Sequence, residues 1–216
     1  MFHATHFALS RMFFSFEGID GSGKSTQARL LADVLRQRGL EVVGVREPGG
    51  TDLGERVRDL LLNPEAEISP RAELLMFSAA RAQLVDAVIR PALDRGALVI
   101  ADRFYDSSTA YQGAGRELTH MAWMSSLHAF ATAGLSPLRT YLIDVSPSVS
   151  MSRRSERDAD RMEQGDEAFY SRVRSAYLSL RHTEADRLLV LDGTRSVSDL
   201  HAQIVSDATA LIQRTV

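Results

Sequence analysis

Residues 18–25 have the residue types and the spacing of a phosphate-binding loop. They read Gly-Ile-Asp-Gly-Ser-Gly-Lys-Ser, which fits the pattern G-x-x-x-x-G-K-[ST], and they stand between an apolar segment and a segment of helical period. Glycines let a backbone turn tightly and bring its N–H groups against phosphate oxygens, and the following helix directs its positive end at the anion. In this pattern Lys24 reaches the β- and γ-phosphates of a nucleotide, and Ser25 holds Mg²⁺. A plain glycine-rich turn is the alternative.

Lys24 is the only lysine among the 25 lysine and arginine side chains, and all the others are arginine. A slender ammonium group can enter a phosphate loop, whereas a wide, planar guanidinium fits there poorly. We attribute the scarcity of lysine to a general compositional bias and the position of Lys24 to function.

Residues that can bind a second ligand occur at two further places. Asp102 and Arg103 follow an apolar run at the predicted carboxyl end of a strand, where open parallel sheets bind ligands; the alternative is a structural ion pair. Phe77 and Arg81 are spaced i, i+4 and share a helix face, so an aromatic plane and a forked donor can jointly address a pyrimidine carbonyl. Spacing alone favours the alternative, in which Phe77 belongs to the core and Arg81 is an exposed cation.

The segment 153–166 is dense in charge and nearly free of apolar residues, and it contains Arg153, Arg154, Arg157 and Arg161. On charge alone it predicts a solvated helix face or loop. Its position after the predicted fourth strand supports a second interpretation, a lid that closes over a nucleotide.

Short apolar runs alternate with longer segments of helical period, which is typical of a parallel sheet with crossover helices. The pattern therefore predicts an α/β fold. Ser69 before Pro70, and Ser146 before Pro147, mark two helix starts. The predicted strands are 12–17, 41–46, 97–102, 138–145 and 187–192. The predicted helices are 24–38, 52–62, 70–94, 119–133, 147–153, 167–184 and 198–213.

The length of 216 residues predicts a single domain, 12–216, preceded by an N-terminal extension, 1–11, without a function of its own. A net charge of −3 argues against a general nucleic-acid-binding protein. The absence of cysteine excludes a disulfide scaffold, a cysteine nucleophile and a cysteine-ligated zinc site. Because the sequence has neither a membrane-spanning apolar run nor a convincing secretory signal, we expect a cytoplasmic protein that does not bind membranes.

The chain resembles thymidylate kinases in five segments that occur in the family's order and at similar spacing. These are FEGIDGSGKST (16–26), REPGGT (46–51), LLMFSAARAQL (74–84), DRFYDSSTAYQG (102–113) and DRMEQ (160–164). The resemblance covers essentially the whole chain apart from the extension. It implies a P-loop NTPase three-layer sandwich, with a five-stranded parallel sheet flanked by helices. It also implies transfer of the γ-phosphoryl group of MgATP to dTMP, giving dTDP and ADP in dTTP biosynthesis.

The resemblance implies roles for individual residues. Arg103 binds phosphate, and Asp102, with Ser25, organises Mg²⁺ partly through water. Phe77 stacks on thymine and Arg81 bonds the base carbonyl O4.

Further residues are expected to line the acceptor and donor pockets. Ser108, Tyr111 and Gln112 are expected on the loop beyond Arg103, where the tyrosine disfavours a 2′-hydroxyl. Asp20 addresses the sugar hydroxyl region of the acceptor. The predicted dTMP-binding residues are Asp20, Glu47, Pro48, Arg58, Phe77, Arg81, Arg103, Ser108, Tyr111 and Gln112. The predicted ATP-binding residues are Gly18, Ile19, Asp20, Gly21, Ser22, Gly23, Lys24, Ser25 and Thr26.

The sequence departs from part of the family at Gly21, because some thymidylate kinases carry a catalytic arginine at this position of the loop. The required charge must then come from the lid at about 153–166, as in family members with basic lids. We expect Arg154 or Arg157 to be the principal lid cation, supported by Arg161. The predicted catalytic residues are Lys24, Asp102, Arg103, Arg154, Arg157 and Arg161.

Two alternative functions remain open: another nucleoside-monophosphate or deoxynucleoside kinase, and a non-catalytic nucleotide switch. Phe77 with Arg81 argues against the first. A guanine-binding switch needs an N-K-x-D segment, which a chain whose only lysine is Lys24 cannot supply. The resemblance further implies a homodimer through helices on one side of the sheet, although the apolar face of 74–89 can equally belong to the core.

Overall fold

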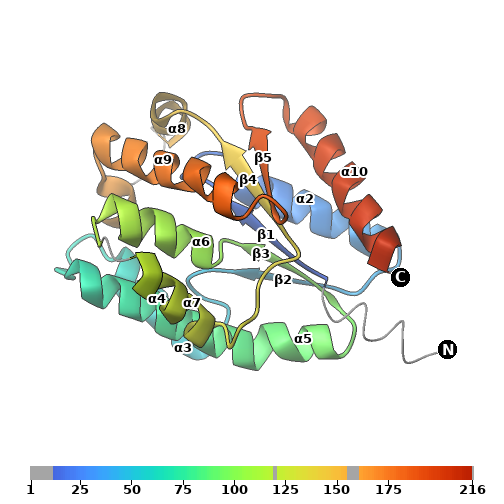
Figure 1. The fold of residues 1–216 in the computed structure, drawn as a ribbon, viewed down its shortest axis with the longest axis horizontal. Helices are drawn as coiled ribbons and strands as arrows, with labels where there is room; N and C mark the ends of the chain where they lie inside the picture. The colour runs from blue at the N-terminus through green and yellow to red at the C-terminus, as the bar shows by residue number, and fades with distance from the viewer. Residues whose placement is uncertain (1–11, 119–120, 155–160, 216) are drawn as a thin grey trace.

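The computed structural model describes residues 12–118, 121–154 and 161–215 (Figure 1). The predicted extension, 1–11, and the predicted lid residue Arg157 lie outside the described residues.

The described strands form one parallel sheet of five strands in the order β2-β3-β1-β4-β5. This arrangement confirms the predicted sheet. The strands are β1 (Phe13–Glu17), β2 (Val42–Arg46), β3 (Leu98–Asp102), β4 (Arg139–Asp144) and β5 (Leu188–Asp192).

Helices cover both faces of the sheet and complete three layers (Figure 1). α2 and α10 cover one face, while α4, α5 and α9 cover the other. In chain order the helical segments are α2 (Lys24–Gln37), α3 (Asp52–Leu62), α4 (Pro70–Leu84), η1 (Val85–Ile89), α5 (Arg90–Asp94), α6 (Tyr105–Ser108), η2 (Thr109–Gly115), α7 (Met121–Ala131), α8 (Pro147–Arg154), η3 (Arg161–Gln164), α9 (Glu167–Thr183) and α10 (Val197–Thr215). No helix in these described ranges has the length and apolar character needed to cross a membrane.

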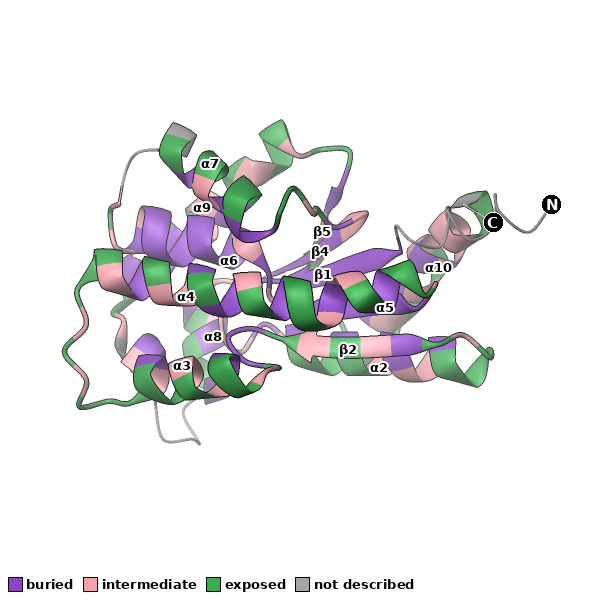
Figure 2. Cartoon of the chain, turned by 90° about the horizontal axis from the view of Figure 1, so that it is seen from below, coloured by how far each residue is buried: buried purple, intermediate pink, exposed green. Residues whose placement is uncertain are grey.

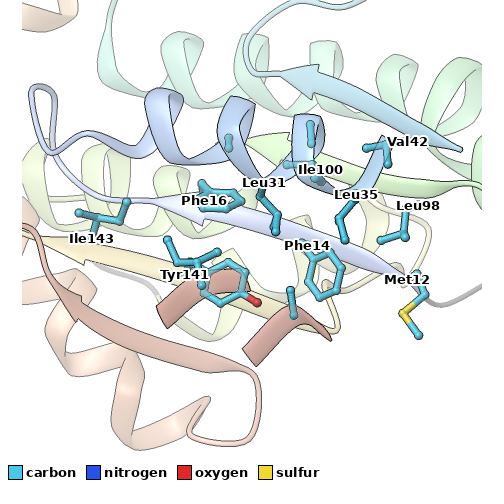
Figure 3. Close-up of a cluster of buried hydrophobic side chains, with 14 of the residues drawn as sticks. Met12, Phe14, Phe16, Leu31, Leu35, Val42, Leu98, Ile100, Tyr141 and Ile143 are labelled. Carbon is cyan, nitrogen blue, oxygen red and sulfur yellow. The ribbon is translucent and has the colours of Figure 1, made fainter. Parts of the chain in front are cut away.

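The central strand β1 is buried on both faces, whereas the edge strand β2 begins at the buried Val42 and then alternates between partly buried and exposed residues (Figure 2). Successive side chains of a strand point to opposite faces. Phe14 and Phe16 pack beside Leu31 and Leu35 of α2 (Figure 3). The other face of β1 therefore takes the odd-numbered positions, and the last of them is Glu17.

The predicted helix 70–94 is continuous in direction but changes its hydrogen-bond pattern at residues 85–89, which form the π-helical segment η1. Pro91 follows directly, at the start of α5. Because proline has no N–H to donate and its ring crowds the carbonyl four residues earlier, a wider turn at this point accommodates it.

The prediction that Ser108, Tyr111 and Gln112 lie on a loop is wrong, because residues 105–115 form the consecutive helical segments α6 and η2. The segment carries serines, threonine and glycines, which have weak helix propensity. Its helical form is supported by burial: Ala110 and Tyr111 belong to a core cluster with α9. A Cβ on Gly115 would lie 2.7 Å from the Phe169 ring, so a glycine lets the two helices approach.

The parallel strands end at the same edge of the sheet, and α6 and α8 lie beyond it (Figure 1). Loops from several strands therefore meet there, which is where ligands of such sheets bind.

Candidate active site

The phosphate loop joins β1 to α2 through backbone conformations that favour glycine. Gly18 has a φ of 140°, and a Cβ there would lie 2.5 Å from the carbonyl oxygen of Ile143. Gly21 has a φ of 76°, and its Cβ would lie 2.9 Å from the carbonyl oxygen of Ser150. Gly23 caps α2 without a side-chain hydrogen bond, which leaves N–H groups of the first turn available for an anion.

Asp20 lies in the loop between two cations. Its Oδ1 is 3.3 Å from Lys24 Nζ and accepts a hydrogen bond from Arg103, and its Oδ2 accepts one from the Tyr111 hydroxyl at 2.8 Å. Burial disfavours the charged form, but Arg103 and Lys24 outweigh it and hold the pKa of Asp20 well below its usual range. Asp20 is thus a compensated carboxylate, which explains how an acid is accommodated in a phosphate loop.

Arg103 is held over the loop by acceptors on several sides. Its Nη1 donates to the Gly18 carbonyl and to Ser107 Oγ, both at 3.0 Å, and to the Tyr177 hydroxyl at 3.3 Å. Its backbone has a φ of 73°, in the left-handed region that non-glycine residues seldom adopt. The chain therefore turns sharply at Arg103 between β3 and α6, and such strained positions are frequent at functional sites.

A cavity of about 620 Å³ opens beside the phosphate loop, within the size range of small-molecule sites. It brings together most of the residues that the sequence predicts for the site. Those lining it are Asp20, Gly21, Gly23, Lys24, Ser25, Thr26, Glu47, Pro48, Arg58, Phe77, Asp102, Arg103, Ser108, Tyr111 and Gln112. Of the other predicted site residues in the described ranges, Gly18, Ile19, Ser22, Arg81, Arg154 and Arg161 do not line it.

Arg81 is a buried cation with 1% of its surface exposed, so the interpretation of Arg81 as an exposed residue is wrong. It forms an ion pair with Glu47 at 2.6 Å and donates to Ser108 Oγ at 3.1 Å and to the Phe104 carbonyl at 3.3 Å. Burial raises the pKa of Glu47, and Arg81 counteracts this. Arg81 Nη1 is also buried and has no hydrogen-bond partner among the described residues.

Arg81→Ala is expected to lower the free energy of unfolding by about 3–5 kcal/mol, because it leaves the Glu47 carboxylate buried without its cation. Urea titration measures this loss. The matched control is Arg95→Ala, which breaks an exposed ion pair with Glu41 and is expected to cost about 0–1 kcal/mol. Equal losses in the two variants would contradict a stabilising role for the buried pair.

Other residues predicted for the acceptor pocket are held by hydrogen bonds of their own. Arg58 Nη1 donates to the Pro48 carbonyl at 2.9 Å, and Phe77 is half-buried beside them. Gln112 Nε2 donates to Glu73 at 2.8 Å. These contacts hold an aromatic ring and polar groups around one space.

Arg153, at the end of α8, lines the cavity and donates to the carbonyls of Gly21 at 3.2 Å and Gly193 at 3.0 Å. It therefore connects the end of α8, where the predicted lid begins, directly to the phosphate loop. Arg154 is buried instead, donating to the Tyr170 hydroxyl at 2.9 Å with its guanidinium 4.4 Å from the ring centre.

Arg161 does not face the cavity. Its side chain is 9% exposed, forms an ion pair with Glu73 at 2.7 Å and donates to the Leu61 carbonyl at 2.7 Å. In this conformation Arg161 connects η3 to α3 and α4. Glu73 also forms an ion pair with Arg116, so its carboxylate is shared by two arginines.

Sequence reasoning missed Glu17, Glu73, Ser107 and Tyr177, which hold the site residues in place. Glu17 had a signal, since it is the only charged residue in the apolar strand Phe13–Glu17. Glu73 stands one helical turn before Phe77, but its arginine partners are distant in sequence. Tyr177 is 160 residues from Glu17, and no local pattern relates them.

A glycine-rich phosphate loop that faces an aromatic and arginine-lined pocket, at the carboxyl edge of a five-stranded parallel sheet, defines a P-loop nucleoside-monophosphate kinase. The sequence model of the family described as thymidylate kinase matches residues 16–204. The chain belongs to the thymidylate kinase family.

Individual relatives agree with this assignment. Thymidylate kinases from Kosmotoga olearia and Deinococcus radiodurans are each 48% identical to the chain, over 197 and 194 residues. These alignments cover 91% and 89% of this chain and 94% of each relative. The crystal structure of thymidylate kinase from Ehrlichia chaffeensis has a TM-score of 0.75 and 33% identity, covering 92% of this chain and 98% of that one.

Proposed function

We propose that this chain transfers the γ-phosphoryl group of ATP to dTMP, forming dTDP and ADP for dTTP biosynthesis in the cytoplasm. The observation that carries the proposal is the placement of Lys24, Arg103 and Phe77 around one cavity. They provide a donor-phosphate cation, a cation for the acceptor phosphate and a plane for the base. Membership of the family supports the same reaction.

On the donor side, the phosphate loop and Lys24 bind the phosphates of ATP. Mg²⁺ fits Ser25 and Asp102, because both line the cavity and Asp102 Oδ1 is buried without a hydrogen-bond partner among the described residues. Hydroxyl and carboxylate oxygens are ligands that Mg²⁺ prefers, directly or through water. The ion, when bound with ATP, supplies positive charge to the β- and γ-phosphates.

On the acceptor side, Phe77 stacks on thymine, and Arg81 Nη1 is the N–H donor that remains for the base carbonyl. Glu47 and Ser108 hold the Arg81 guanidinium plane. Asp20 accepts a hydrogen bond from the sugar hydroxyl, and Tyr111 beside it leaves little room for a 2′-hydroxyl.

The remaining predicted acceptor residues surround these groups. Pro48 and Gln112 border the base pocket, and Arg58 and Arg103 serve the acceptor phosphate.

In the reaction, an oxygen of the dTMP phosphate attacks the γ-phosphorus while the bond to the β–γ bridging oxygen breaks. ADP leaves, and no covalent enzyme intermediate forms. Such a loose transition state needs two aligned nucleotides and compensation of negative charge. Lys24, Arg103 and the lid arginines supply that charge.

Single alanine substitutions at Arg153, Arg154, Arg157 and Arg161 test the lid. At least one is expected to lower kcat by about 10³-fold, because a transition-state arginine is worth that much or more. Arg172→Ala, on the exposed side of α9, is the control and is expected to keep kcat. Values within about threefold of the unsubstituted chain for all four lid variants would remove the lid arginines from catalysis.

A turnover panel tests the acceptor. With MgATP as donor, dTMP is expected to give a higher kcat/KM than dCMP, dGMP or thymidine. Preference for one of those acceptors would establish a different nucleotide kinase. If dTMP and MgATP gave no ADP, the chain would be a non-catalytic nucleotide-binding protein.

We further propose a homodimer through α3, α4 and α7, which lie on one side of the molecule (Figure 1). These helices expose large apolar side chains at Leu53, Leu60, Leu75, Trp123 and Phe130, the last of them 85% exposed. Several large apolar side chains exposed on one side of a molecule are typical of a protein interface. Sedimentation is expected to give twice the chain mass of 23.8 kDa, and a monomer alone at all concentrations would exclude the dimer.

A further inference from the structure

Glu17 ends β1 directly before the phosphate loop, yet it does not line the cavity. The residue is fully buried. Its carboxylate accepts hydrogen bonds from the Phe104 N–H at 2.7 Å and from Ser107 Oγ at 2.6 Å. Because these donors follow Arg103 in the chain, Glu17 stabilises the turn in which Arg103 adopts a left-handed backbone conformation.

The hydroxyl groups bound to Glu17 also hold Arg103. The Tyr177 hydroxyl donates to Glu17 Oε2 at 2.9 Å and lies 2.8 Å from Ser107 Oγ. Arg103 Nη1 donates to both hydroxyl oxygens, at 3.0 Å to Ser107 and 3.3 Å to Tyr177. Glu17 is thus connected to the Arg103 guanidinium through two hydroxyl groups that hydrogen-bond to both of them.

An ionised carboxylate sets the direction of these hydrogen bonds, since it can only accept. Either both hydroxyls donate to Glu17, or one hydroxyl donates to the other, which in turn donates to Glu17. In both arrangements the hydroxyl protons point away from Arg103 and toward the carboxylate. Their lone pairs then remain for the guanidinium of Arg103. An amide at position 17 presents N–H donors, which compete for the same lone pairs and turn a hydroxyl proton toward Arg103.

Above a pH of about 7, Glu17 carries its charge at a cost in stability. Burial and the nearby Asp106 raise the pKa of Glu17 to about 7, while Arg103 acts in the opposite direction. A carboxyl group whose pKa is higher in the folded than in the unfolded chain stabilises the fold at low pH, and this contribution is lost as the pH rises through about 7. Carboxylates retained against stability are typical of functional sites.

We propose that Glu17 is a positioning residue whose carboxylate orients the Ser107 and Tyr177 hydroxyls and so presets the Arg103 guanidinium for the acceptor phosphate. The inference rests on the proposed function, in which Arg103 binds that phosphate. It assigns Glu17 no contact with either substrate.

Glu17→Gln tests the proposal because it keeps the side-chain shape and removes the acceptor-only charge. We expect kcat/KM for dTMP to fall about 10- to 100-fold, a usual effect of losing a group that orients a site residue. KM for ATP is expected to stay within about twofold, because the donor phosphates bind Lys24 and the loop backbone. The thermal unfolding midpoint at pH 8 is expected to stay the same or rise, since an unfavourable charge is removed.

A double-mutant cycle with Arg103→Ala separates positioning from a general structural effect. In the Arg103→Ala background, Glu17→Gln is expected to change kcat/KM for dTMP less than about threefold, because the group it positions is gone. A further tenfold loss in that background, or an unchanged kcat/KM in the single variant, would overturn the proposal. If Glu17→Gln does not fold, Tyr177→Phe, with an expected three- to tenfold loss, enters the same cycle under the same criteria.

The matched control is Asp207→Asn on α10. Its carboxylate also accepts from a tyrosine hydroxyl, that of Tyr141 at 3.0 Å, and from Arg139 at 3.0 Å, but it lies outside the cavity lining. Its kcat/KM is expected to match that of the unsubstituted chain. Absence of dTMP turnover in the unsubstituted chain would count against the proposed function. Calorimetric binding of dTMP then tests Glu17 by itself: tenfold weaker binding by Glu17→Gln supports the inference, and equal affinity overturns it.

Discussion

Lys24→Arg is expected to lower kcat for dTMP phosphorylation by about 10³-fold or more, although it conserves the charge. Lys24 is 6% exposed, and its Nζ lies 3.3 Å from Asp20 Oδ1. Burial and the neighbouring Arg103 lower the pKa of Lys24, and Asp20 acts against this. A guanidinium is wider than an ammonium group and planar, so in this position we expect it to displace either the loop or the bound phosphate.

The measurement is kcat at saturating ATP and dTMP, with ATP binding determined separately. Arg29→Lys is the control on the same helix, because Arg29 is exposed and its ion pair with Asp33 lies at the surface. It is expected to leave kcat unchanged. Near-normal turnover of Lys24→Arg would show that the loop needs a charge but not an ammonium group.

Arg103→Lys is expected to lower kcat/KM for dTMP by about 10²- to 10³-fold. The guanidinium donates from separate nitrogens to the Gly18 carbonyl on one side and to Asp20 and Tyr111 on the other. A lysine carries its donors on a single atom and cannot bridge these partners. The position of the cation would therefore change even though its charge is kept.

Arg139→Lys is the matched control for this substitution. Arg139 also pairs with an aspartate, Asp207, but it stands at the beginning of β4 and does not line the cavity. It is expected to retain kcat/KM. An Arg103→Lys variant with the same kinetic constants as this control would exclude Arg103 from acceptor binding.

The fold was largely predictable because its signals are local. Each strand is a short apolar run, and Ser69 and Ser146 cap their helices as predicted. The helix at 105–115 was missed because its stability comes from burial against α9 rather than from the propensities of its own residues. Local patterns also contain no information on the order in which parallel strands pair.

Residues of the candidate site were predictable where they belong to a contiguous motif, as Lys24 and Asp102 do. The burial of Arg81 was not, because its carboxylate partner, Glu47, is 34 positions away. The same holds for Arg161, whose charge is taken up by Glu73 of another helix. In both cases the charge of a residue was evident from the sequence, but the partner that decides its role was brought near only by the fold.

The close approach of α8 to Gly21 constrains how the sequence can evolve. With a φ of 76° and a Ser150 carbonyl 2.9 Å from any added Cβ, this position excludes the loop arginine that some family members use. A lineage cannot acquire that arginine in one step while α8 stays where it is. In the proposed mechanism, catalytic charge from the loop and catalytic charge from the lid are therefore separate solutions. Passing between them requires coordinated changes in two segments about 130 residues apart.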